Sequence, residues 1–252
     1  MSKLNHLITS WPKNAIYLIS WLQNQGYSNQ LLLKYKKSNW IKSLGSGAVI
    51  KQGDKPTIEG ALYALQKQGE FKIHIGGKTA LNLLGKAQYL EFNNQNYYLF
   101  ESNSQALPKW FTNRKWISGF NITKNSILPV NLGLIEMDFG SYSLIISGAA
   151  RAIMECLFLS PKHQDLIECY QIMENLNNLR PNNIQKLLES CTSVKVNRLF
   201  LFLAKKAGHD WYYKLDLEKI NLGKGKRKIV DNGIYIPEFK ITVPKILVNG
   251  EL

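Results

Sequence analysis

The sequence predicts an α+β protein in two parts, a small N-terminal helical domain that ends in a hairpin and a larger mixed α/β domain. Three observations predict it. Apolar residues recur at helical spacing through residues 14–39, glycines flank Ser46 directly afterwards, and beyond residue 55 strand-like alternation is mixed with long helical stretches. The 252 residues, 45% of them hydrophobic, are enough for a substantial core.

The N-terminal elements are bounded by clear stop and start signals. Trp11-Pro12 interrupts a first helix, Gly26 ends a second and Ser28 is a good N-cap for a third. We expect helices at 2–10, 14–25 and 29–39, the last with Leu31, Leu32, Tyr35 and Trp40 inward. We expect a hairpin of 40–44 and 48–51 around Gly45-Ser46-Gly47. This order is the layout of a winged helix-turn-helix, predicted for 1–54.

The remainder, 55–252, is predicted to be an α/β domain, with a boundary as late as about residue 90 as an alternative. Thr57 is predicted to cap a helix through Gln68, and Gly76-Gly77 to open a short one at 78–84. We expect strands at 71–75, a hairpin of 89–92 and 97–100, a loop at 107–110 and further strands through Ser147. Helices are expected at 149–159, 165–177, 182–190 and 194–207, then strands near 212–217, 226–231 and 234–243.

The charge is strongly positive and unevenly spread. The net charge is +14, and residues 1–90 contain 12 lysines against 3 acidic residues. An excess of this size predicts a polyanionic partner for the N-terminal third. A general lysine- and asparagine-rich composition bias is the alternative explanation.

The third helix and the hairpin are the predicted DNA-binding surface. N-terminal residues of a recognition helix reach base edges, and Asn and Gln read adenine, so Ser28, Asn29 and Gln30 are expected near the bases. Cations on the helix and hairpin are expected to hold phosphates. The candidate residues are Ser28, Asn29, Gln30, Lys34, Lys36, Lys37, Lys42, Ser46 and Lys51. A solvated basic helix is the alternative.

A second basic group lies near the C-terminus. Helical spacing places Lys195, Arg198 and Lys205 on one face, and the loop LGKGKRK adds further cations. The candidates for a surface that binds an anionic partner or neutralises a toxin are Lys195, Arg198, Lys205, Lys224, Lys226 and Arg227. A charged helix face beside a polar loop is the plainer alternative.

Signals for catalysis are weak. Glu136 and Asp138 lie two apart in an expected strand and could hold a divalent metal, but an exposed strand face explains them equally. Gly76-Gly77-Lys78-Thr79 opens a helix and could bind an anion or simply permit a turn. The four histidines are scattered, and the three cysteines are those of reduced core thiols. We predict no enzyme, no cofactor and no metal.

No stretch approaches the roughly 20 apolar residues of a membrane span, and the N-terminus has no secretory pattern. The expectation is a cytoplasmic protein with no membrane contact.

Specific stretches carry a resemblance that spans nearly the whole chain. They are GYSNQLLLKYKKSNWIKSLGSGAV, TIEGALYALQ, HIGGKTALNLLG, LPKW, LRPNNIQKLLESCTSVKVNRLFLFLA, GHDW, LGKGKR and FKITVP. Together they resemble the AbiEi family, the antitoxins and autoregulators of AbiE-type (type IV) toxin–antitoxin systems linked to phage abortive infection. The resemblance implies a winged helix that binds inverted repeats upstream of its own operon, a C-terminal antitoxin domain and a nucleotidyltransferase-like toxin encoded alongside.

Three positions depart from the family pattern. Ser46 stands where an arginine is common, Val49 where an aromatic follows the wing glycines, and Leu33 where the recognition helix usually has arginine. The Gly148–Arg151 stretch also lacks an acidic residue before the arginine. Altered DNA affinity is the expected consequence. The alternative function is a stand-alone winged-helix regulator whose C-terminal domain senses a ligand or protein.

Overall fold

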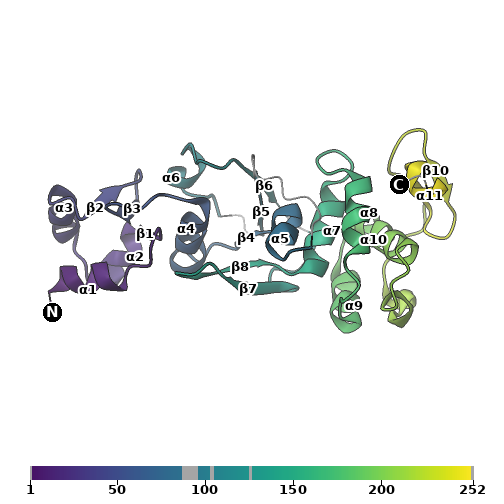
Figure 1. Cartoon of the computed structure of the whole chain (residues 1–252), viewed down its shortest axis with the longest axis horizontal. Helices are drawn as coiled ribbons and strands as arrows, with labels where there is room; N and C mark the ends of the chain where they lie inside the picture. Colours follow the sequence, from purple (N-terminus) through teal and green to yellow (C-terminus); the bar gives the residue numbers. More distant parts are fainter. Residues whose placement is uncertain (1, 87–95, 103–104, 125–126, 251–252) are drawn as a thin grey trace. The chain divides into compact units, whose positions relative to one another are not determined.

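The computed structural model describes residues 2–86, 96–102, 105–124 and 127–250 (Figure 1). The chain divides into two compact units, each assembled from separate segments. The first unit comprises Met1–His74, Asn94–Lys124 and Glu136–Ile146, and the second comprises Ile75–Asn93, Asn125–Ile135 and Ser147–Leu252.

The first unit begins with a winged helix-turn-helix. Its elements are α1 (Lys3–Ser10), β1 (Ile16–Leu18), α2 (Ile19–Asn24), α3 (Asn29–Lys37), β2 (Ile41–Ser43) and β3 (Ala48–Lys51). The strands form an antiparallel sheet in the order β1-β3-β2. Figure 1 shows α3 next to the β2–β3 hairpin, in the purple part of the ribbon.

One N-terminal prediction is wrong. The expected helix over 14–25 is a strand followed by a shorter helix, because Ile16, Tyr17 and Leu18 pair with β3 and are all buried. Their helical spacing did not decide the structure, since pairing within the sheet and burial override local propensity. The other expected helices and both hairpin strands are confirmed within two residues at each end.

A dense core fixes the recognition helix to the sheet. Leu32 and Tyr35 of α3 are buried with Leu22, Ile41 and Val49 in one cluster. Trp11 stacks on Tyr17 in the same cluster, with ring centroids 4.1 Å apart. The orientation of α3 is therefore set by side chains from every other element of the winged helix.

A five-stranded sheet in the order β6-β5-β4-β8-β7 lies mostly in the first unit, with the ends of β4, β7 and β8 in the second. The strands are β4 (Ile73–Ile75), β5 (Tyr97–Glu101), β6 (Phe120–Lys124), β7 (Leu134–Asp138) and β8 (Ser143–Ser147), and the helices are α4 (Ile58–Tyr63), the π-helical η1 (Ala64–Gln68) and α6 (Lys109–Thr112). Thr57 caps α4, as expected. The side chain of Gln66 ties η1 to the sheet through the backbones of Ile73 and Ile145.

Two expectations for this sheet need comment. The strand expected at 97–100 is present as β5 and pairs in parallel with β6. Its expected hairpin partner at 89–92 lies outside the described residues. The loop expected at 107–110 is wrong in part, because Lys109 begins α6, which buries Trp110 and Phe111.

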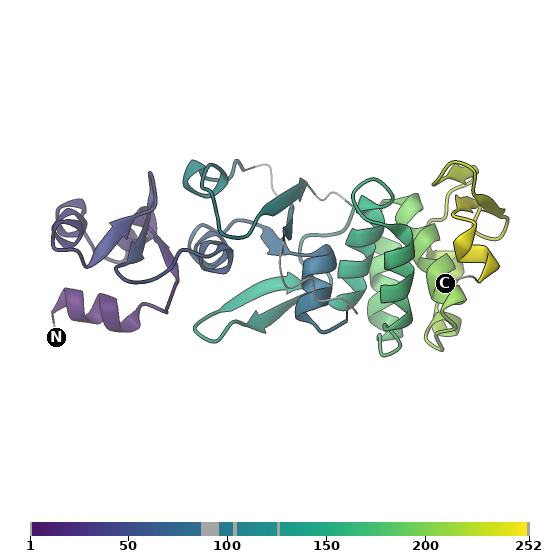
Figure 2. The ribbon, with the colours of Figure 1, turned by 45° about the horizontal axis from the view of Figure 1, so that its top comes forward.

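The second unit is mainly helical, and Figure 2 shows α7, α8 and α10 side by side. Its helices are α5 (Gly77–Leu83), α7 (Ala149–Leu159), α8 (Leu166–Glu174), α9 (Pro181–Ser190), α10 (Val194–Lys206) and α11 (Ile246–Asn249). Eight of the eleven residues of α7 are buried, as expected for a central helix. A small sheet, β10-β11-β9, is formed by β9 (Arg227–Lys228), β10 (Ile234–Ile236) and β11 (Ile241–Val243).

The strand expected near 212–217 is wrong. That stretch forms two 3₁₀ turns, η2 (Tyr212–Lys214) and η3 (Leu217–Lys219). The turns follow from local bonding, since the Asp216 carboxylate accepts from the Glu218 amide and Trp211 is anchored by donating to Leu176.

Candidate nucleic-acid interface

The outward face of α3 combines polar, apolar and cationic side chains. Counted from Gln30, the residues Leu33, Lys34 and Lys37 follow at spacings of three, four and seven, so all four share the face opposite Leu32 and Tyr35. All four are exposed, and Leu33 is 55% exposed. A cation-rich helix face with one amide near its N-terminus has the composition of a major-groove reader.

Two of the predicted base-reading residues have local partners. The Ser28 hydroxyl accepts a hydrogen bond from the Leu31 amide at 3.3 Å and so caps α3. The Asn29 Oδ1 accepts from the Gln23 Nε2 at 2.7 Å, which links α3 to α2. Gln30 has no such partner among the described residues, so it is the amide most available to a base edge.

The wing tip is a tight turn supported from within the first unit. Gly45 and Gly47 have positive φ values of 121° and 95°, which glycine adopts without strain. The Ser43 hydroxyl donates to the Gly45 carbonyl at 2.9 Å. A Cβ on Gly45 would lie 3.2 Å from the Cβ of Trp110, so the backbone approaches α6 closely there. Ser46 is exposed at the tip, and Lys42 is exposed on β2.

Two of the lysines predicted to contact phosphates, Lys51 and Lys36, are less exposed than the others. The Lys51 ammonium lies 3.4 Å from the Trp11 carbonyl and 4.0 Å from the Asp54 carboxylate, and its side chain is 23% exposed. Lys51 is therefore partly engaged within the domain, and its assignment to a phosphate stays a prediction. Lys36 is half-buried on the flank of α3, beside the outward face.

Sequence reasoning missed one aromatic at this surface. Trp40 was expected inward but is 47% exposed between α3 and β2. Its backbone amide donates to Tyr35, and Gln52 donates to its carbonyl, so the residue is held in place. The signal available in the sequence was the neighbouring Asn39, which takes the left-handed conformation (φ 56°) and turns the chain outward.

The three departures from the family pattern have different structural consequences. Val49 is fully buried in the core cluster, so its replacement of an aromatic concerns packing. Leu33 and Ser46 lie on the exposed face and at the wing tip. These two positions are where a missing arginine would change contacts with DNA.

The predicted C-terminal basic surface is corrected at two residues. Arg198 is 1% exposed, and its guanidinium donates to the carbonyls of Leu222, Gly225 and Lys240 at 2.6, 2.7 and 3.1 Å. Lys195 donates to Phe158 and Ser160 at 2.7 and 2.6 Å. Burial, followed by the charge of Arg227, lowers the Lys195 pKa. Both side chains therefore stabilise the fold, because their hydrogen bonds go to backbone carbonyls of the protein itself.

The remaining predicted cations are accessible. Lys205 is 42% exposed and pairs with Glu238 at 2.6 Å. Lys224, Lys226 and Arg227 are exposed on the loop that Arg198 secures, and the Lys226 ammonium lies 5.1 Å from the Tyr235 ring centroid. Their assignment to a partner surface stays a prediction.

The weak catalytic signals have structural explanations. Glu136 accepts from Lys67 at 2.8 Å and from the Ser143 hydroxyl at 2.5 Å, and these hydrogen bonds lower its pKa. Asp138 accepts from the Gly140 amide at 2.7 Å in a turn. Among the described residues, no three His, Cys, Asp or Glu side chains gather as metal ligands.

The Gly76–Thr79 helix start has an anionic partner within the protein. The Gly77 amide donates to the Glu155 Oε2 at 2.9 Å, so a buried carboxylate occupies the place predicted for an external anion. Arg151 pairs with this carboxylate at 2.9 Å. The acidic partner of Arg151 is therefore Glu155, one helical turn after it. The family pattern led us to expect an acidic residue before Arg151.

The described residues include no helix long and apolar enough to cross a bilayer. A comparison with curated proteins found no match. The RV2827C protein from Mycobacterium tuberculosis, a solved structure, is similar with a TM-score of 0.61 and 10% identity over 94% of this chain and 88% of that chain. At this identity the likeness shows the fold alone.

Two family models match nearly the whole chain. The N-terminal model, of the AbiEi antitoxin N-terminal domain of transcriptional regulators, matches residues 1–92. The second, described as a transcriptional regulator and AbiEi antitoxin of a type IV toxin–antitoxin system, matches residues 94–244. The chain therefore belongs to the AbiEi family of antitoxins, the transcriptional regulators of type IV toxin–antitoxin systems.

Proposed function

We propose that the winged helix represses its own operon by placing α3 in the major groove of inverted repeats upstream of it. Gln30 reads a base edge, Lys34 and Lys37 bind phosphates from the same helix face, and Lys42 and Ser46 contact the backbone from the wing. The observation that carries the proposal is the exposed Gln30–Leu33–Lys34–Lys37 face, held rigidly on the core by Leu32 and Tyr35.

The domain organisation that we propose has a winged helix at 1–54 and the antitoxin part after it. All elements of the three-stranded sheet and the buried residues of the core cluster that orients α3 lie within the first 51 residues, and Tyr63 and Tyr142 pack against that cluster. The compact units and the family models place their boundaries elsewhere, so a fragment 1–54 that folds and binds DNA is the direct check.

The test is DNA binding measured by fluorescence anisotropy over a salt series. Lys34, Lys36, Lys37 and Lys42 could neutralise about four phosphates per winged helix, which gives a slope of log affinity against log salt of about −3.6. The Lys34→Gln/Lys37→Gln variant should make the slope of log affinity against log salt less steep by about 1.8. It should weaken binding to operator and scrambled DNA alike.

A matched control is Lys72→Gln/Lys115→Gln, which removes the same charge from exposed positions of the first unit outside α3 and the wing. It should leave the slope and the preference for the operator unchanged. Equal losses from both double variants would contradict the assignment of α3, since the effect would then come from net charge.

For the antitoxin activity, we propose that the counterpart is a nucleotidyltransferase-like toxin encoded beside this gene. The exposed cations Lys224, Lys226 and Arg227 are the proposed surface for a toxin or its ligand, because Arg198 holds their loop in one conformation. Growth rescue on co-expression should be lost in Lys224→Glu/Lys226→Glu and kept in Lys162→Glu/Lys214→Glu. Growth rescue by both variants would show that this surface is not needed for the antitoxin activity.

A further inference from the structure

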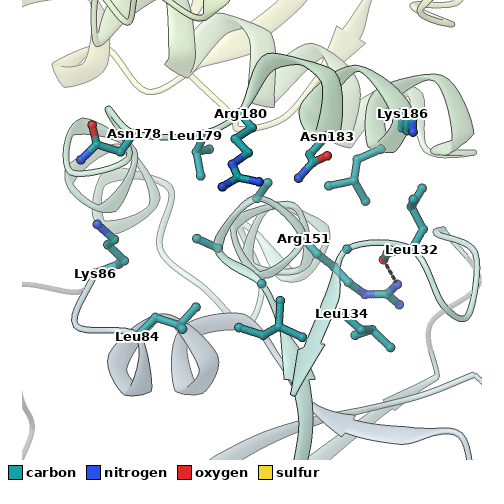
Figure 3. A pocket seen from close by; sticks show the side chains of 16 residues that line it. Leu84, Lys86, Leu132, Leu134, Arg151, Asn178, Leu179, Arg180, Asn183 and Lys186 are labelled. Carbon is teal, nitrogen blue, oxygen red and sulfur yellow. Dashed lines mark hydrogen bonds between the residues drawn. The ribbon is translucent and has the colours of Figure 1, made fainter. Parts of the chain in front are cut away.

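A cavity of about 500 Å³ lies within the second unit, where the first turns of α7 and α9 meet the end of α5 (Figure 3). This volume falls within the range of roughly 300–1,000 Å³ that is typical of small-molecule sites. The functions discussed so far make no use of it.

The charge of the lining is one-sided. Lys86, Arg151, Arg180 and Lys186 line the cavity, and among the described residues no Asp or Glu does. Arg180 and Lys186 are exposed, and within the described ranges neither side chain has an ion-pair or hydrogen-bond partner. Figure 3 shows both on the α9 side of the cavity, with Lys86 across from them. Cations that line one cavity, with no counter-charge among the described lining residues, favour an anionic ligand.

The backbone adds to the positive potential. The eleven-residue helix α7 starts at the cavity wall, its N-cap Gly148 supplies no side-chain acceptor, and its first turn contains no acidic residue. The N-terminal amides of such a helix attract anions.

A buried donor in the same wall also lacks a partner. Arg151 is 0% exposed, and its Nη1 donates to the carbonyls of Pro129 and Leu132 at 2.8 and 2.6 Å. Its Nε binds Glu155, but its Nη2 makes no hydrogen bond within the described structure. Figure 3 shows the side chain running along the wall toward Leu132 and Leu134. The buried Nη2 has no exposed surface, so Arg151 adds positive charge to the cavity wall without offering a direct hydrogen bond to a ligand.

The ligand also has an apolar part. Leu84, Leu134, Leu179 and Leu187 line the same cavity as the cations. A flat apolar group can lie against them while phosphates reach the cations and the start of α7. We propose that this cavity binds a free nucleoside phosphate, with the phosphates at Arg180, Lys186 and the α7 N-terminus and the base against the leucines.

The test is calorimetric titration of the full-length protein with ATP, AMP and adenosine at low and at physiological salt. ATP should bind saturably and more tightly than AMP, and neutral adenosine should bind weakly. Arg180→Gln/Lys186→Gln should weaken ATP binding at least about tenfold, because two charge-assisted contacts are lost. Both side chains are exposed and unpaired, so thermal melting of this variant should match the wild type.

The matched control is Lys162→Gln/Lys214→Gln, which removes the same charge from exposed positions of the second unit outside the cavity. It should change ATP binding less than twofold. Equal weakening by both pairs, or equal binding of ATP and adenosine, would overturn the proposal. DNA binding by the Lys34→Gln/Lys37→Gln variant is a separate readout, so failure at one site is distinguishable from failure at the other.

Discussion

The guanidinium of Arg151 and the carboxylate of Glu155 form a fully buried ion pair, with Nε 2.9 Å from Oε1 and neither side chain exposed. The second carboxylate oxygen accepts from the Gly77 amide at 2.9 Å and from the Ser147 hydroxyl at 2.8 Å. One buried carboxylate thus joins α7, the start of α5 and the end of β8.

We expect Glu155→Gln to destabilise the protein by about 3 kcal/mol, because it leaves a buried arginine without its counter-charge. Urea denaturation followed by circular dichroism measures this. The control is Glu238→Gln, whose partner Lys205 is 42% exposed, and its cost should stay below about 1 kcal/mol. Similar losses in the two variants would contradict a special role for the buried pair.

Gln30→Ala should separate base reading from phosphate binding. Loss of a bidentate base contact costs about 1–3 kcal/mol of discrimination at one base pair and leaves binding to scrambled DNA unchanged. Anisotropy with a set of single-base operator variants measures this. Asn29→Ala is the comparison, since the Asn29 side chain is hydrogen-bonded to Gln23. An identical change in base discrimination in both variants would contradict the assignment of base reading to Gln30.

Leu33→Arg should strengthen DNA binding. The position is 55% exposed on the outward face of α3, so a guanidinium there gains a phosphate without loss of core packing. The slope of log affinity against log salt should steepen by about 0.9. Val49→Arg, at a fully buried position, should instead prevent folding. No steepening in Leu33→Arg would place that face away from DNA.

Arg198→Met should loosen the segment that the guanidinium holds. Three backbone carbonyls lose their donor, so limited proteolysis at the lysines of 224–228 should become faster while the fold survives. Mass spectrometry of the fragments locates the cuts. Lys206→Met is the control on the same helix, and faster cleavage there as well would indicate general destabilisation.

The three thiols should resist modification at pH 8. Cys156, Cys169 and Cys191 are buried and free, and burial raises the pKa of each thiol. Unfolded thiols ionise near pH 8.5 and the native ones do not, so stability should fall as the pH rises above about 8.5. A thiol-reactive dye should therefore label only in denaturant, and rapid native labelling would contradict the burial.

Much of the fold could be read from local signals. Caps at Ser28 and Thr57 and apolar periodicity located α3, α4 and the helices from α7 to α10. What could not be read depended on contacts distant in sequence. Ile16–Leu18 has helical spacing, and only pairing with Ala48–Ile50 makes it a strand.

The candidate site shows the same division. Exposure of Gln30, Lys34 and Lys37 follows from helical periodicity. The internal use of Lys51 and Arg198 depends on carbonyls far along the chain, at Trp11 and at Lys240. The basic cavity was missed because its cations come from separate elements, and each looks like an ordinary surface residue by itself.

The interleaving of the two units has a consequence for the synthesis and the proteolysis of the protein. The backbone passes from one unit to the other five times between residues 74 and 147. A nascent chain therefore completes its first unit only after residue 146 has been synthesised, and a single protease cut between those residues interrupts both units at once. A cut within 75–146 should therefore divide both units, while the winged helix proposed for 1–54 stays on one fragment.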